Sequence, residues 1–287
     1  WQSMNNYSGT FDGGLHTIRN LCQRITGNYA SQDEKINSGL VGQSAQATGC
    51  TVKNVLLDRV DIQSGVTGSS HETLGSLVGM AQGATKVEHC GVTNAVVQKA
   101  AGGSNSYFCA VGGLVGDLRD TSAVVDSYYQ GTAANLAKSP AATAGYHVGV
   151  LAGRNCNGTG TLSNSYASAV VKNEVTTGVK YTGQLIGDYK FTSSALINCY
   201  YDSSKNPGMA AQTGETGKTQ QELQSFEMTR LLNGAGRKGA NRVWYTAAAS
   251  MPSGGFPCFT KPNSGPLTVN ATDSLPAAYG TATAAAG

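Results

Sequence analysis

The stretch Gly113-Leu114-Val115-Gly116 identifies the architecture of this 287-residue chain, because close variants of it recur on both sides. Residues 39–42, 76–79, 150–153 and 184–187 carry the same apolar–glycine pattern. The final glycines are 37, 37, 37 and 34 residues apart, and they are Gly42, Gly79, Gly116, Gly153 and Gly187. A fixed period of this length is the signature of a repeat architecture. We expect each glycine to occupy a turn that needs a positive φ or a close approach of two backbones.

A second pattern follows each of these glycines after about twelve residues. It places a small side chain between β-forming neighbours, as in Val125-Asp126-Ser127-Tyr128. In a stack of repeats these small residues would lie above one another at a tight inward or corner position. The predicted column is Val55, Cys90, Ser127, Ser165 and Cys199.

Each repeat unit has the composition of short strands joined by flexible turns. Leu and Val run into the glycine, a Gly/Ser/Thr/Asn loop follows, and a β-rich run such as residues 162–171 ends the unit. No unit carries an apolar helical period over three turns. The sequence therefore predicts an all-β fold, a β-solenoid of about six coils with repeats of about 37 residues. A propeller blade has a similar length, but these units hold too few strand-length runs for four strands each.

The apolar–glycine signature resembles the GLUG-motif repeats of large bacterial secreted or surface proteins. Residues 7–18 are similar to the coil that usually precedes such arrays, although Leu15 stands where the second glycine would be. Trp1 resembles the tryptophan commonly found ahead of that coil, which implies that family sequence lies upstream. The resemblance covers residues 1 to about 260. It implies an extracellular or cell-surface location, since the family includes adhesins and the stalk regions of IgA-specific metallopeptidases.

The chain divides into three parts on this interpretation. Residues 1–205 form the GLUG-type repeats, and residues 206–260 form a C-terminal capping segment that closes the open end of the stack. The capping segment holds a helix at about 220–233, which begins with the capping-box spacing of residues 219–222, and then a hairpin. Residues 261–287 are similar to the opening of an MBG-type immunoglobulin-like module, or form a linker.

The charge of the chain limits its possible partners, and its cysteines leave the disulfide pattern open. With 20 basic and 17 acidic residues the net charge is +3, and no basic patch points to nucleic acid or to an anionic lipid surface. No apolar run is long enough to span a membrane. Of the seven cysteines, Cys50, Cys109 and Cys156 lie near glycine-rich turns, where neighbouring coils could bring two within disulfide range; the connectivity stays open.

Three motifs suggest chemistry and are incomplete. Residues 214–219 resemble a phosphate-binding loop, but Gln212 stands where the motif needs glycine. The pair at residues 71–72 begins a zinc-peptidase motif, yet Gly75 replaces the second histidine, so we expect a loop there. The two aspartates within residues 58–61 would face opposite sides of a strand. The sequence predicts no enzyme activity, no metal and no cofactor.

Tyrosine is the remaining candidate for surface binding. In each tyrosine pair one ring is expected to face the core and the other to face solvent. An exposed ladder of tyrosines could stack sugars or partner side chains, and the alternative is that the rings cap the edge of the solenoid. The residues concerned are Tyr128, Tyr129, Tyr166, Tyr200 and Tyr201.

The sequence favours a non-enzymatic structural or adhesive segment of an extracellular surface or fibre protein. Its expected partners are other modules of the same long chain, host glycans or surface proteins, or copies of itself in a fibre. Two alternatives stay open: a carbohydrate-binding or carbohydrate-cleaving β-helix, and an accessory stalk of a large secreted peptidase.

Overall fold

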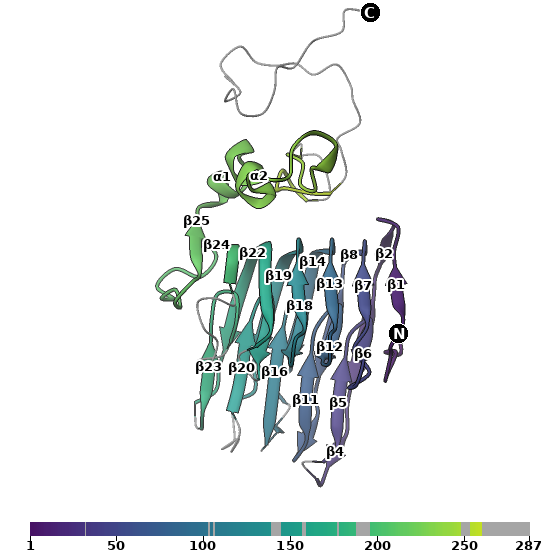
Figure 1. The fold of residues 1–287 in the computed structure, drawn as a ribbon. Helices are drawn as coiled ribbons and strands as arrows, with labels where there is room; N and C mark the ends of the chain where they lie inside the picture. The colour runs from purple at the N-terminus through teal and green to yellow at the C-terminus, as the bar shows by residue number, and fades with distance from the viewer. Residues whose placement is uncertain are drawn as a thin grey trace, which may run out of the picture.

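The chain is a parallel β-solenoid. The computed structural model describes residues 1–31, 33–102, 104–105, 107–138, 145–156, 159–176, 178–187, 196–247 and 253–259. Successive coils lie side by side in chain order, and the two helices lie over one flank of the stack (Figure 1). Paired strands of neighbouring coils are parallel and are offset by about one repeat, as in His71↔Phe108. This pairing confirms the predicted solenoid, whereas a propeller would need antiparallel blades.

The four-stranded sheet contains four of the repeat glycines, Gly42, Gly79, Gly116 and Gly153, and the five-stranded sheet contains the segments that lead into it. The five-stranded sheet contains β5 (Lys35–Ser38), β11 (His71–Leu74), β16 (Phe108–Gly112), β20 (Gly145–Gly149) and β23 (Lys180–Thr182). The four-stranded sheet contains β6 (Val41–Gln43), β12 (Val78–Ala81), β17 (Val115–Leu118) and β21 (Ala152–Asn155). A three-stranded sheet contains β4 (Asn28–Tyr29), β10 (Thr67–Gly68) and β15 (Ser104–Asn105).

The largest sheet has 13 strands and wraps two further sides of the coils. One column within it contains β1 (Thr10–Asp12), β7 (Thr51–Lys53), β13 (Lys86–Glu88), β18 (Ala123–Val125) and the start of β22 (Thr161–Asn173). The next column contains β2 (Thr17–Arg19), β8 (Leu56–Asp58), β14 (Gly91–Lys99), β19 (Tyr128–Asn135), the rest of β22, β24 (Leu196–Asp202) and β25 (Thr216–Lys218). The remaining members are β3 (Cys22–Ile25) and β9 (Asp61–Ser64).

The repeat glycines are required by close backbone contact and not by a left-handed conformation. None of the five is among the residues with positive φ. A Cβ placed on Gly116 would lie 2.5 Å from the carbonyl oxygen of Gly79, in the preceding coil, and 2.7 Å from the amide nitrogen of Leu74. The prediction that these glycines occupy turns is wrong for Gly116, which lies inside β17, where the close approach of the preceding coil leaves no room for a side chain.

The second repeated pattern forms a corner. Asn54, His89, Asp126, Asn164 and Asn198 all have left-handed backbones, with φ between 47° and 53°. Asn and Asp tolerate this conformation better than most residues, which explains their recurrence one place before the small residue. The small residues point inward and are buried, as predicted; they are Val55, Cys90, Ser127, Ser165 and Cys199. The amide of Cys90 donates to Ser127 Oγ at 3.2 Å, so the column is also hydrogen-bonded.

One hydrophobic cluster runs through the coils from Leu21 to Tyr201. Within the same interior, the ammonium of Lys99 lies 2.7 Å from the carboxylate of Glu72, and both side chains are fully buried. Lys99 also donates to the carbonyl of Val66 at 2.6 Å, which ties the loop after β9 to the next coil. The pair His71-Glu72, expected in a loop, lies instead in β11.

The predicted helix is interrupted. It consists of α1 (Gln220–Leu223) and α2 (Phe226–Asn233), because Ser225 accepts from the amide of Met228 and caps a second helix. The predicted capping box at Thr219 and Glu222 is present, and Gly234 ends α2 with a φ of 62°. A 3-10 turn, η2 (Gly239–Asn241), follows.

Within the described residues of the expected hairpin, Tyr245 and Cys258 form an antiparallel bridge. Residues 261–287, predicted to be a linker or a further module, lie outside the described residues.

The last coil is closed by a carboxylate. In an earlier coil the amide of Leu151 donates to the carbonyl of Leu185 in the next coil, at 2.9 Å. At the end of the stack, Glu215 takes over this role, accepting from the amides of Leu185 at 2.6 Å and Ile186 at 3.4 Å. Burial raises the pKa of Glu215, although backbone hydrogen bonds oppose the shift.

The cysteines do not cross-link the coils. All seven are free, so Cys50, Cys109 and Cys156 form no disulfide with each other. Among the described helices, none is long and apolar enough to cross a membrane.

Candidate functional site

The tyrosine column is buried, contrary to the expectation of a solvent-facing ladder. Tyr129 and Tyr201 belong to the solenoid core. Tyr128, Tyr166 and Tyr200 face outward from the coils, but they pack into a second cluster with residues of the C-terminal segment. The predicted alternation of inward and outward side chains along these strands therefore holds. The sequence did not reveal that the helices and the bridge cover the outward tyrosines on the flank of the solenoid, instead of covering its open end.

The covering segment, residues 219–259, is called the cap below. It packs on the tyrosines by aromatic contacts and a hydrogen bond. Within the coils, the ring centroids of Tyr128 and Tyr166 are 5.3 Å apart and the rings are nearly parallel, at 4°. From the cap, Phe256 stacks on the Tyr166 ring at 6.0 Å, and Trp244 contacts it at 5.6 Å with a tilt of 56°. The Tyr166 hydroxyl donates to the carbonyl of Pro257 at 2.7 Å. These contacts leave no exposed tyrosine ladder for sugars to stack on.

Asp126 anchors the cap at the left-handed corner of its coil. Its carboxylate accepts hydrogen bonds from Arg237 and, at 3.4 Å, from Trp244 Nε1. His89 Nε2 lies 3.5 Å away in the neighbouring coil. Desolvation acts to raise the pKa of Asp126, but the hydrogen bonds from His89 and Arg237 hold it below its ordinary value. A buried carboxylate therefore joins the cap to two coils.

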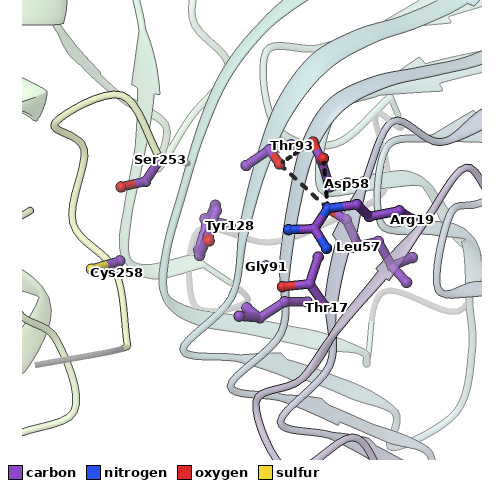
Figure 2. A pocket seen from close by; sticks show the side chains of 10 residues that line it. Thr17, Arg19, Leu57, Asp58, Gly91, Thr93, Tyr128, Ser253 and Cys258 are labelled. Carbon is purple, nitrogen blue, oxygen red and sulfur yellow. Dashed lines mark hydrogen bonds and ion pairs between the residues drawn. The ribbon is translucent and has the colours of Figure 1, made fainter. Parts of the chain in front are cut away.

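A cavity of about 70 Å³ opens where the tyrosine column ends. Gly91 stands in register with Tyr128, and the Tyr128 ring occupies the space where a side chain at position 91 would be. Beyond this ring the strands β2, β8 and β14 form one wall, and the cap forms the other (Figure 2). The cavity is lined by Thr17, Arg19, Leu56, Leu57, Asp58, Gly91, Thr93, Tyr128, Ser253 and Cys258.

The polar wall of this cavity is one row of the sheet, with Arg19, Asp58 and Thr93 in register on three coils. Arg19 Nε lies 3.5 Å from Asp58 Oδ2. Thr93 Oγ1 donates to Asp58 at 3.2 Å, and Asn94 donates to it at 2.9 Å. Desolvation acts to raise the pKa of Asp58, but these hydrogen bonds and the charges of Arg59 and Arg19 keep it below its ordinary value. Asp58 is thus a fixed carboxylate.

The prediction that Asp58 and Asp61 face opposite sides of the strand is wrong. Each is partly exposed on the outer side of its strand, because the left-handed Arg59, with a φ of 58°, interrupts the alternation between them. They nevertheless hold separate partners, since Asp61 pairs with Arg24. The structure does not assemble them into a shared pair of carboxylates.

The histidines are separated in the same way. His89 and its neighbour Cys90 lie on opposite sides of the corner, with Cys90 in the core. His71 contacts the Phe108 ring at 4.3 Å and lies 3.4 Å from an Arg119 nitrogen. Burial, together with the charges of nearby Arg119, Arg154 and Lys35, lowers the pKa of His71 to about 4. Among the described residues, no group of three or more His, Cys, Asp or Glu side chains is placed to hold a metal ion.

Sequence reasoning missed the cavity because its two walls come from distant parts of the chain. The coil wall was within reach, since Thr17, Leu56, Gly91 and Tyr128 occupy equivalent places in successive units. The cap wall, which includes Ser253, carries no repeat and no motif.

Comparison with known proteins adds little to this picture. No family model matches the chain, and no curated protein matches it significantly. A crystal structure from Bacteroides ovatus, whose name assigns it provisionally to the immunoglobulin A1 proteases, is 17% identical to this chain. That match covers 90% of this chain and 80% of the other, with a TM-score of 0.49. The fold of the present chain therefore rests on its own strand registers and not on this likeness.

Proposed function

We propose that this chain is a non-enzymatic structural and adhesive segment of an extracellular protein. The observation that carries the proposal is the single hydrophobic cluster that runs from Leu21 to Tyr201 through all the coils. A stack with one continuous core bends and opens less readily than modules joined by linkers, because each coil contacts its neighbours along whole strands. At about 4.8 Å per coil, about five coils make a spacer roughly 24 Å tall.

The repeat pattern supports membership of the GLUG-type arrays of bacterial secreted or surface proteins. On this proposal the segment lies at the cell surface and is joined to other modules of the same chain. It meets host glycans, host surface proteins or copies of itself. An accessory stalk of a secreted peptidase would use the same stiffness, and it is the second reading of the same observation.

Adhesion without turnover tests the proposal. Beads coated with the purified chain should be retained on epithelial cells or on a glycan array more strongly than beads coated with the heat-unfolded chain. Equal retention of both would contradict an adhesive role and leave only the spacer role. Release of reducing sugars from the retained glycans would instead favour a carbohydrate-cleaving enzyme.

A further inference from the structure

We propose that the cavity between the cap and the first three coils binds the terminal sugar residue of an uncharged glycan (Figure 2). This inference rests on the proposed adhesive function, and it names the site and the ligand class.

The lining of the cavity carries one charge of each sign, on Arg19 and Asp58. Asp58 Oδ2 lies 3.5 Å from Arg19 Nε and 3.3 Å from the Nε of Arg59, which is not part of the lining. An anion would be attracted by Arg19 and repelled by Asp58, and a cation would meet the reverse. The site therefore favours a neutral ligand that offers both donors and acceptors to a guanidinium and a carboxylate, as neighbouring hydroxyl groups do.

The rest of the lining alternates between hydroxyl groups and apolar surface. Thr17 and Thr93 contribute hydroxyls, while Leu56, Gly91 and the Tyr128 ring contribute carbon. A sugar ring presents hydroxyls at its edge and C–H groups on its faces, so it matches both parts of this lining.

On the cap side the cavity includes a hydroxyl that needs a partner. Ser253 is 3% exposed, and its Oγ makes no hydrogen bond within the described parts of the chain. Leaving a buried hydroxyl unsatisfied costs free energy, which a hydrogen-bond partner recovers. Figure 2 shows the Ser253 oxygen on the side of the residue away from Tyr128 and Arg19, so a ligand in the cavity reaches it after a rotation about the Cα–Cβ bond.

The size and exposure fit a terminal residue. A cavity of about 70 Å³ holds on the order of five water-sized groups, which is room for the edge of one sugar ring and not for a longer oligosaccharide. The side chain of Arg19 is 54% exposed, and Thr17 is exposed, whereas Tyr128 and Ser253 are buried. The cavity therefore opens to solvent at the first coil and ends beneath the cap.

The test is saturation-transfer NMR with free neutral monosaccharides: hexoses, N-acetylhexosamines and deoxyhexoses. Thr17→Phe places a ring in the mouth of the cavity without removing a buried side chain. Thr10→Phe is the matched control, because Thr10 is also exposed and also begins a strand of the first coil, outside the cavity. We expect at least one neutral sugar to bind the wild type and the Thr10→Phe variant equally, and to bind Thr17→Phe at least about tenfold more weakly.

Arg19→Ala should weaken the same sugar by about tenfold as well, since a charge-assisted hydrogen bond is lost. The proposal is overturned if no neutral sugar binds, if charged sugars alone bind, or if Thr17→Phe binds like Thr10→Phe. Bead adhesion separates this failure from that of the proposed function. If beads coated with the Thr17→Phe variant still adhere, the adhesive surface lies outside this cavity. If beads coated with the wild type do not adhere at all, the proposed adhesive function is contradicted.

Discussion

Replacing Gly116 by alanine tests the close packing of β17 on the preceding coil. The new Cβ would lie 2.5 Å from the Gly79 carbonyl oxygen and 2.7 and 2.9 Å from the amide nitrogen and carbonyl oxygen of Leu74. In protein structures a Cβ atom essentially never lies within 3.0 Å of a heavy atom that is not a chain neighbour. All three atoms near the new Cβ belong to the backbone and are held by parallel ladders to adjacent coils. Overpacking of this kind costs about 1–3 kcal/mol. Because no side chain can rotate away, we expect about 3 kcal/mol, and more for Gly116→Val.

Thermal unfolding followed by circular dichroism measures this cost. A loss of about 3 kcal/mol lowers the Tm of a domain of this size by roughly 6–12 °C. Gly102→Ala is the matched control, since Gly102 is exposed and a Cβ there would meet nothing within 4 Å. Its Tm should stay at or slightly above that of the wild type. If Gly116→Ala also melts within about 1 °C of the wild type, the close approach of the coils is refuted.

Two further predictions concern the cap. Because folding lowers the pKa of Asp126, its stabilisation is complete above the ordinary aspartate pKa of about 4 and is lost as the pH falls below it. In a Trp1→Phe background, the fluorescence of buried Trp244 should therefore shift to the red only below about pH 4. The additional substitution Asp126→Asn should remove this transition. If the pH profile of the fluorescence is the same with and without Asp126→Asn, the role of Asp126 as an anchor of the cap is contradicted. Tyr166→Phe deletes the hydrogen bond to Pro257 and should cost about 1 kcal/mol in urea unfolding; no change would mean that this bond contributes nothing.

The regular part of the fold could be predicted from the sequence. Residues that repeat in every coil, such as Gly116 in β17 and Ser127 in the inward column, meet equivalent neighbours in each layer, so the same physical requirement recurs along the sequence. A sequence pattern that recurs in every coil can be detected even where a single occurrence of it would be a weak signal. The capping box at Thr219 was legible for a different reason, since both of its partners lie within one turn of chain.

The candidate site could not be predicted, because it depends on contacts that occur once. Tyr166 has the same sequence context whether its outward ring meets water or a cap, and only the docking of Trp244 and Pro257 decides between them. Alternation also fails at Arg59, where a single left-handed residue turns Asp58 and Asp61 to the same side of the chain. Such local reversals carry no periodic signal.

Binding without turnover is the central claim, and one time course tests it most directly. The purified wild type is incubated on the glycans that retain it, and the reducing ends in solution are measured while the bound protein is followed. We expect stable retention of the protein, with reducing ends at the level of the heat-unfolded chain. A steady rise in reducing ends above that level, abolished by Asp58→Asn, would contradict it and assign the cavity to an enzyme.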